Sequence, residues 1–154
     1  MVRLVPMTET EFQAYLECDV KRYAQEHIKA ADWNPSEALE KSRREHDRLL
    51  PNGLASKNQH LFSIEAEELG AKVGIIWFAV HNASAFVYDL LIHDRFRRRG
   101  YGTQALVALE EEVRRLGVDT ISLHVFAHNR PARALYENVG YKGKGSYMSK
   151  RLIV

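Results

Sequence analysis

The order of apolar and polar positions divides the chain into extended and helical segments, beginning with a short strand and a long helix. Residues 2–5 predict an edge strand. A helix is predicted to start at Thr8, where Glu11 completes a capping-box arrangement three residues later, and to continue to about Lys29. Apolar side chains recur along it at three- and four-residue steps, which predicts one buried stripe made of Phe12, Tyr15, Leu16, Val20 and Tyr23.

A second helix is predicted directly after the first. Asn34 is a suitable cap, Pro35 suits the first turn, and Glu37 places an acid near the positive end of the helix dipole. The helix ends near Leu50 because residues 51–53, Pro-Asn-Gly, cannot continue it. The two helices therefore form a pair that precedes the sheet.

Three extended segments follow the helical pair. Residues 60–67 and 72–80 predict two strands, joined by a turn around residues 68–70. Residues 74–80 are apolar at both the even and the odd positions, which predicts a central strand covered on both faces. After a further turn, residues 86–92 predict a third strand. Consecutive strands with tight turns predict an antiparallel meander.

The second half of the chain alternates between helix and strand. Residues 103–116 predict an amphipathic helix that Gly117 caps, followed by a strand over residues 119–126. A helical connection makes this strand parallel to its predecessor. Asn129-Arg130-Pro131 begins a short helix that Gly140 closes, and residues 141–154 predict one or two final strands with a turn marked by Gly143 and Gly145.

These elements predict the α+β class with α/β/α layers, that is, a mixed, mostly antiparallel sheet with helices on both faces. With 154 residues, 45% hydrophobic and 27% charged, the chain is expected to form one domain over residues 1–154 of a globular protein. A single cysteine, Cys18, excludes an internal disulfide and fits the cytoplasm. No signal-peptide pattern or membrane-length apolar run is present in the sequence.

The turn between residues 97 and 102 carries the main candidate chemistry. It reads Arg-Arg-Arg-Gly-Tyr-Gly and lies between a predicted strand and a predicted helix. Backbone N–H groups at a helix start have no partner within the helix, and the dipole adds positive charge beside them. Gly100 and Gly102 let the backbone bend and approach a ligand closely. The turn therefore predicts a diphosphate site, with a solvated arginine-rich turn as the alternative.

Two motifs together resemble the GNAT superfamily of N-acetyltransferases. Arg97-x-x-Gly100-x-Gly102 after a strand is similar to its cofactor-binding motif, and Asn129, seven residues before Tyr136, is similar to its next block. The order of elements agrees over essentially the whole chain, and the chain looks most like small bacterial members of the yycN-like type. The resemblance implies the GNAT acyl-CoA N-acyltransferase fold, acetyl-CoA as donor and an amine as acceptor.

The resemblance also implies roles for individual residues. Backbone groups of three residues would bind the thioester carbonyl and the pantetheine amides, namely Leu90, Leu91 and Ile92, with an N–H near Leu90 as oxyanion donor. The pyrophosphate would lie on the turn and the first helical residues, namely Arg97, Arg98, Arg99, Gly100, Tyr101, Gly102 and Thr103. Asn129, Ala132 and Tyr136 would face the cofactor. Asn129 can also act as a plain helix cap.

Acetyl transfer to an amine requires a base, because an alkyl amine with a pKa of about 10 is mostly protonated and freeing it costs about 4 kcal/mol. His124 is the first candidate: an imidazole is out of place in this apolar strand. Its position five before Asn129 holds a glutamate base in the ribosomal-protein alanine acetyltransferases. A core histidine bonded to backbone is the alternative. Phe86 stands where histone-type relatives place a glutamate, which leaves the identity of the base open.

Other polar side chains have weaker assignments. Tyr136 is the candidate general acid, because a phenol keeps its proton at neutral pH and can give it to a thiolate; a packed aromatic is the alternative. Asp89 either holds the amine or a water molecule, or braces a loop. His124 and His128 have no neighbouring cysteine or carboxylate cluster in the sequence, so no metal site is expected.

Two other functions compete with catalysis, and the acceptor is not readable from the sequence. A net charge of +2 argues against nucleic-acid binding, although the cluster at residues 95–99 lies beside Phe96 and Tyr101. The second alternative is a GNAT-fold sensor that binds acetyl-CoA without turnover. Residues 23–51, with Trp33 at the bend, would shape the acceptor pocket without choosing between small amines, polyamines, antibiotics and protein N-termini. Homodimers are common in the family.

Overall fold

The computed structural model describes residues 1–143 and 145–152. Its strands are β1 Val2–Pro6, β2 Gln59–Ala66, β3 Ala71–His81, β4 Ser84–Ile92, β5 Thr120–His124 and β6 Tyr147–Arg151. Its helices are α1 Glu9–Lys29, α2 Ala38–Leu49, α3 Tyr101–Arg115 and α4 Arg130–Asn138, with short 3-10 turns η1 Gly53–Ala55 and η2 Asp94–Phe96.

The six strands form one sheet in the order β1-β2-β3-β4-β5-β6. Every neighbouring pair is antiparallel except β4 and β5, which α3 connects in parallel. This confirms the predicted meander, the parallel crossover and the mixed, mostly antiparallel sheet. The central position of β3 also agrees with its sequence, because residues 73–79 are all buried.

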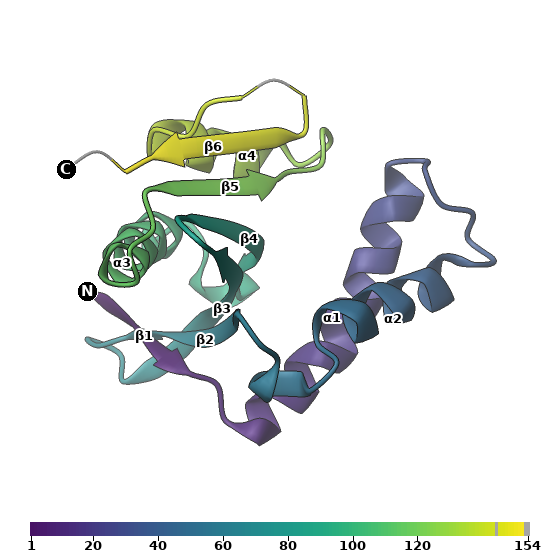
Figure 1. The fold of residues 1–154 in the computed structure, drawn as a ribbon, viewed down its shortest axis with the longest axis horizontal. Coiled ribbons are helices and arrows are strands. Elements are labelled where there is room, and N and C mark those ends of the chain that lie inside the picture. Colours follow the sequence, from purple (N-terminus) through teal and green to yellow (C-terminus); the bar gives the residue numbers. More distant parts are fainter. Residues whose placement is uncertain (144, 153–154) are drawn as a thin grey trace.

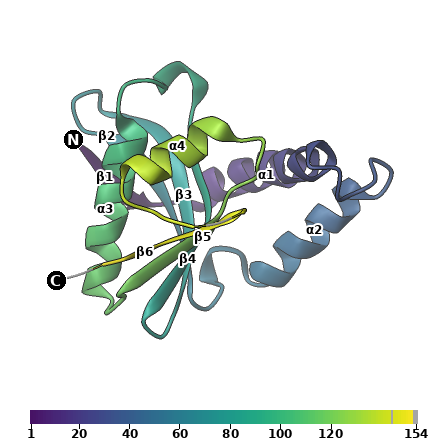
Figure 2. The same cartoon turned by 90° about the horizontal axis from the view of Figure 1, so that it is seen from above.

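Helices cover both faces of the sheet, as predicted (Figure 1, Figure 2). On one face, α1 and α2 lie side by side, and Phe12 and Tyr15 of α1 pack with Ile75 and Trp77 of β3. On the other face, Leu106 and Leu109 of α3 join a larger core that includes α4. The capping box of Thr8 and Glu11 is present at the start of α1.

Four predicted boundaries were wrong. The strand predicted to begin at residue 86 begins two residues earlier, at Ser84. The second helix begins at Ala38 rather than near Asn34, because the Asn34 side chain and carbonyl bond to Glu37 in a turn that precedes the helix. The third helix begins at Tyr101, two residues before the prediction. The fifth strand ends at His124 rather than at residue 126, because the chain leaves the ladder after it.

Within its described residues, the final segment forms the strand β6 and an isolated bridge between Lys142 and Ser149. Gly145 has φ of 64°, in agreement with a turn before β6. The last two residues of the segment predicted as strand, 153–154, lie outside the described residues.

A β-bulge in the middle of β4 changes the face to which its side chains point. Trp77 is opposite Asp89 and Phe78 is opposite Val87, so Tyr88 is the extra residue. Before the bulge, Val87 belongs to the core under α3; after it, Asp89 contacts α1. A bulge inserts one residue into a two-residue repeat and so reverses the phase of the alternation. It therefore directs Asp89 toward α1 instead of the α3 core.

Candidate active site

The ladder between β4 and β5 stops halfway along β4. The paired residues run from Ser84 opposite Thr120 to Val87 opposite Leu123. Beyond Val87, β4 continues to Ile92 paired with β3, whereas β5 ends one residue after Leu123. The backbone of residues 88–92 therefore has an edge without a neighbouring strand in the described part of the chain, as the predicted pantetheine site requires.

One cavity of about 1120 Å³ opens at this split. Pockets for drug-sized ligands measure about 300–1,000 Å³, so this one is large enough for an extended donor and a second substrate. The predicted site residues that line it are Leu90, Leu91, Ile92, Arg97, Arg98, Gly100, Tyr101, Gly102, Thr103, His124, Asn129, Ala132 and Tyr136. The fold thus gathers nearly the whole predicted set around one space, while the individual roles stay predictions.

The turn before α3 has the shape expected of an anion cradle. Gly100 caps the helix with φ of 82°, and Arg98 has φ of 63°, so the backbone turns sharply twice. The described backbone and side-chain hydrogen bonds include no acceptor for the amides of residues 98–103. These donors surround the positive end of α3, where a phosphate is favoured.

The arginines of the turn differ in what they contact. The Arg97 side chain donates from Nε to the Ile92 carbonyl at 2.9 Å and pairs with Asp94 at 3.1 Å, so it braces the end of β4. Arg98 lines the cavity. The Arg99 guanidinium lies 5.9 Å from the centre of the Phe96 ring, and Arg99 is outside the cavity lining found for the described residues.

Asn129 is the cap of α4, which was the alternative reading of this residue. Its Oδ1 accepts a hydrogen bond from the Ala132 amide at 3.3 Å. Both residues line the cavity, so the cap stands at the wall of the proposed pantetheine channel. A contact with the cofactor stays a prediction.

Tyr136 lies deeper in the same wall. It is 7% exposed and its ring meets the Tyr141 ring at 5.9 Å in an edge-on arrangement. Burial raises the pKa of Tyr136 well above its ordinary value, and the nearby charge of Asp89 raises it further. The phenol is therefore protonated at neutral pH, as a general acid must be.

His124 ends β5 and is half-buried. Its ring contacts Phe126 and Tyr147 edge-on, at 4.8 and 5.1 Å between centroids. Burial lowers the pKa of His124, and the charge of His27 lowers it further. The imidazole is thus neutral at neutral pH and has aromatic neighbours, which satisfies one requirement of a base and also fits a packed histidine.

Aromatic rings form the outer wall of the cavity around His27 of α1. His27 stacks on Trp33 at 3.8 Å and meets Phe126 edge-on at 5.0 Å. Tyr23 adds an edge-on contact to His27 at 4.5 Å. Helix α1 and the segment after β5, far apart in the sequence, therefore form one aromatic surface beside the predicted base.

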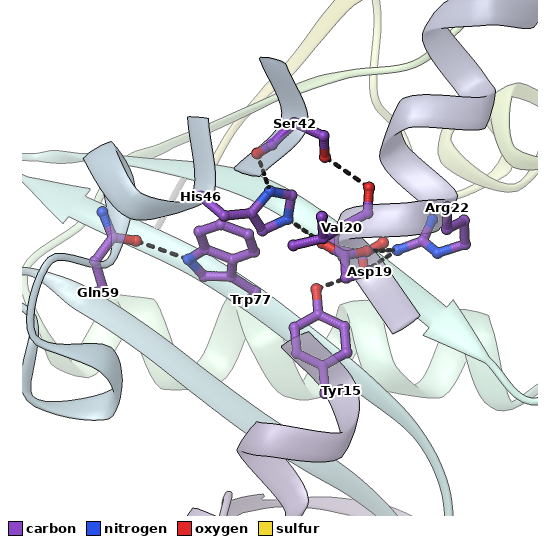
Figure 3. A network of polar contacts seen from close by, with 9 residues as sticks. Tyr15, Asp19, Val20, Arg22, Ser42, His46, Gln59 and Trp77 are labelled. Carbon is purple, nitrogen blue, oxygen red and sulfur yellow. Dashed lines mark hydrogen bonds and ion pairs between the residues drawn. The ribbon is translucent and has the colours of Figure 1, made fainter. Parts of the chain in front are cut away.

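A buried polar network beneath the cavity was not predicted from the sequence (Figure 3). Arg22 Nη2 donates to both Asp19 and Asp89, and Tyr15 Oη donates to Asp89 Oδ2 at 2.7 Å. His46 Nε2 lies 2.8 Å from Asp19 Oδ2. A signal was available in α1: Asp19 interrupts its apolar stripe, four residues after Tyr15.

No sequence signal marked the buried face of the second helix, α2, because that face is not apolar. The buried residues of α2 are Ala38, Ser42 and His46, spaced by four. Ser42 Oγ donates to the Val20 carbonyl at 2.7 Å, and His46 Nδ1 lies 2.8 Å from the Ser42 carbonyl. Hydrophobic periodicity does not detect such a polar face, although the polar face fixes α2 against α1.

A split parallel strand pair, unpaired amides at a helix start and a buried phenol on one cavity are the arrangement expected of an acyltransferase with a nucleotide-bearing donor. The chain belongs to the acetyltransferase (GNAT) family, whose family model matches residues 20–141. It is an N-acetyltransferase. It is 39% identical to the uncharacterized N-acetyltransferase YycN of Bacillus subtilis over 98% of this chain and 99% of that protein. It is 35% identical to YdgE of the same organism over 97% of each chain.

Solved structures agree with the fold. The crystal structure of Bacillus subtilis YycN matches with a TM-score of 0.90 over all of both chains. The PaiA N-acetyltransferase of Thermoplasma acidophilum, solved in complex with coenzyme A, matches with a TM-score of 0.71 at 17% identity over 98% of this chain and 99% of that one. None of the helices among the described residues has the length and apolar character that crossing a membrane requires.

Proposed function

We propose that the protein moves the acetyl group of acetyl-CoA to a primary amine of a small molecule, peptide or protein, by direct attack while both substrates are bound. The observation that carries this proposal is the single cavity that joins the amides of residues 98–103 to the inner face of α1. A donor bound at one end and an amine entering at the other would meet at the split between β4 and β5. No covalent enzyme intermediate is then needed.

The donor would be held mainly by backbone groups. The amides of residues 98–103 would bind the pyrophosphate, and the β4 edge at residues 88–92, where the Ile92 carbonyl already accepts from Arg97, would bind the pantetheine amides. A backbone N–H near Leu90 would donate to the thioester oxygen as charge develops on it. Coenzyme A is present in the PaiA complex, which has the same fold.

Tyr136 would act as the general acid. Its phenol lines the cavity and holds its proton at neutral pH, because burial and the charge of Asp89 raise its pKa. The leaving thiolate is a much stronger base than a thioester sulfur and would take that proton as the C–S bond breaks. Tyr136 would thereby prevent the thiolate from attacking the new amide.

The amine must lose a proton before it attacks, and two side chains on the cavity can accept one. His124 is neutral at neutral pH and remains the candidate that its strand position predicts. Asp89 is the second, because its carboxyl group reaches the cavity beneath α1. Asp89 belongs to β4 and His124 to the neighbouring strand β5, and kinetics of single substitutions can separate their roles.

Thermal unfolding followed by a thiol assay tests the proposal. Acetyl-CoA should raise the melting temperature by binding the folded state. Free thiol should then appear when the protein, acetyl-CoA and a panel of alkyl amines, polyamines and short peptides are mixed. Stabilisation without thiol release for any acceptor would favour the sensor, whereas salt-dependent oligonucleotide binding without stabilisation by acetyl-CoA would favour a nucleic-acid protein.

A further inference from the structure

The carboxyl group of Asp89 lines the cavity on the side of α1. We propose that Asp89 is the proton acceptor of the reaction, and that Tyr15, Asp19 and Arg22 of α1 position and charge its carboxyl group. This inference rests on the proposed acetyl transfer. It assigns a catalytic role to one residue of β4 and positioning roles to three residues of the helix that forms the acceptor side of the cavity.

The backbone geometry of β4 places Asp89 at the reaction centre. Asp89 directly precedes Leu90, whose backbone would contact the thioester. The bulge at Tyr88 turns the Asp89 side chain away from the α3 core and toward α1. Bulges occur next to active sites because they redirect single side chains in this way. A regular strand would have buried this carboxylate in the apolar core.

The two oxygens of Asp89 have different surroundings. Oδ2 accepts hydrogen bonds from Tyr15 and from Arg22, which fixes the carboxyl plane. Oδ1 accepts none from the described residues. Among the described residues, the side-chain atoms that are both fully enclosed and without a partner belong to His27, Gln104 and Tyr141. Oδ1 of Asp89 is not one of them, so it is not fully enclosed. Asp89 lines the cavity, so Oδ1 is the oxygen open to an amine or a water.

The charges around Asp89 support a carboxyl group that can both take and release a proton. Asp19 shares Arg22 with it, and like charges this close raise the pKa of one member of a pair. Burial, followed by the charge of Asp19, raises the pKa of Asp89 to about 7, against the opposing effect of Arg22 and Tyr15. Asp19 stays ionised because His46 and Arg22 lower its pKa more than burial raises it.

The neighbourhood of the two candidate bases favours Asp89 over His124. The charge of Asp89 acts on Tyr136, the proposed acid on α4. The charges that act on His124 belong to His27 and Asp32, near the aromatic wall. The base takes a proton from the attacking nitrogen and the acid gives one to the leaving sulfur, so both groups must lie near the same acetyl carbon. The groups facing Asp89 are then Tyr15, Asp19 and Arg22 from α1, His46 from α2 and Tyr136 from α4.

The proton balance of the step is complete. An ammonium group gives one proton to Asp89, and its nitrogen forms a bond to the acetyl carbon as the C–S bond breaks. The nitrogen loses a second proton, which replaces the one that Tyr136 gives to the thiolate. Asp89 then releases its proton to solvent through the cavity, so the products are an N-acetyl amide, coenzyme A and one proton.

The kinetic experiment compares Asp89→Asn with His124→Gln, using Asp47→Asn as control because Asp47 is an exposed carboxylate on α2. With an alkyl amine that the wild type acetylates, Asp89→Asn should lower kcat by about 100-fold or more and remove the acid limb of the pH–rate profile near pH 7. With a fluorinated alkyl amine, which is already neutral at this pH, Asp89→Asn should lower kcat much less. An acid limb that persists in Asp89→Asn but disappears in His124→Gln overturns the proposal.

Tyr15→Phe tests the positioning role. The hydrogen bond from Tyr15 favours the ionised carboxylate, so its removal should move the acid limb to higher pH while the plateau rate changes little. A merely structural tyrosine would lower stability without moving the limb. An unmoved limb therefore removes Tyr15 from the proposal.

A measurement without turnover keeps the proposal testable if variants lose activity for other reasons. Carbon-13 NMR of the wild type labelled at the aspartate carboxyl groups should show one resonance titrating near pH 7, absent from Asp89→Asn and present in Asp47→Asn. Ionisation of every aspartate below pH 5 overturns the inference even if acetyl transfer occurs. Absence of acetyl-CoA binding by the wild type instead overturns the proposed function, so the two failures are distinguishable.

Discussion

Glu26 of α1 and His128, in the loop before α4, are 102 residues apart in the sequence, yet Glu26 Oε2 lies 2.6 Å from His128 Nε2. The contact joins the acceptor-side helix to the residue that precedes the Asn129 cap. Both residues line the cavity, so the pair connects two of its walls. The Glu26–His128 contact, which is partly exposed, therefore holds α1 and the loop before α4 in position relative to each other.

Glu26→Gln should weaken donor binding slightly. A partly exposed ion pair contributes up to about 1 kcal/mol, which corresponds to a rise of roughly five-fold in KM for acetyl-CoA if the loop loosens. Steady-state kinetics measure this, with Glu9→Gln as control because Glu9 is exposed at the start of α1. An unchanged KM would show that the loop holds its position without the pair.

Gly100→Ala should impair the anion cradle. Gly100 has φ of 82°, and the left-handed conformation costs an L-residue about 1–2 kcal/mol. We expect a lower melting temperature and a smaller stabilisation by coenzyme A. Gly117→Ala is the matched control, since Gly117 also has φ of 82° and open space around a Cβ, and it follows the opposite end of α3. Equal responses of both variants to coenzyme A would contradict the cradle.

Gly74→Ala should destabilise the whole fold. A Cβ at Gly74 would lie 2.1 Å from the Leu91 carbonyl oxygen, so β3 and β4 would have to separate. We expect a loss of at least about 3 kcal/mol in the free energy of unfolding, measured with urea. At Gly102 the nearest atom is the flexible Leu135 Cδ2 at 3.0 Å, and Gly102→Ala should unfold close to the wild type. Wild-type stability of Gly74→Ala would refute the close approach.

His46→Gln should cost stability in a pH-dependent way. The carboxylate of Asp19 and the Ser42 carbonyl raise the pKa of His46 despite its burial. A histidine whose pKa is higher in the folded state stabilises it fully below the unfolded pKa of about 6.5, and this contribution disappears as the pH rises through the folded pKa. The difference from the wild type should be about 3 kcal/mol at pH 6 and smaller at pH 9.

Denaturant unfolding at the two pH values measures this difference. His81→Gln is the control, because His81 is exposed at the end of β3. A deficit for His46→Gln that is equal at both pH values would mean that His46 is neutral in the folded protein.

Tyr136→Phe should lower kcat much more than it changes the affinity for coenzyme A. The substitution removes the phenol proton while the ring keeps its packing beside Tyr141. Thiol-release kinetics give kcat, and melting with coenzyme A reports binding. Tyr141→Phe is the control, because it removes a neighbouring buried hydroxyl that lies outside the cavity lining of the described residues. Unchanged turnover of Tyr136→Phe would end its assignment as the acid.

Periodicity and capping alone determined most of the fold. Three consecutive strands, the helical crossover and the caps at Thr8 and Asn129 depend on neighbours a few residues away. The unpaired amides of the turn at residues 97–102 were predictable for the same reason, because a turn followed by a helix exposes its amides whatever surrounds it. Local patterns therefore contained the turn to which we assign the donor, while diphosphate binding there stays a prediction.

Only the tertiary structure decided the acceptor half. The bulge at Tyr88 leaves no mark in the sequence, yet it reverses which face Asp89 occupies. Asp19 interrupts the apolar stripe of α1, but Arg22 and His46 have the pattern of ordinary polar residues. The contacts that join the three side chains to Asp89 come from packing α2 against α1 and α1 against β4. The charge of a buried carboxylate depends on groups distant in the sequence, because burial and nearby charges set its pKa. That dependence is long-range, so no local pattern contains it.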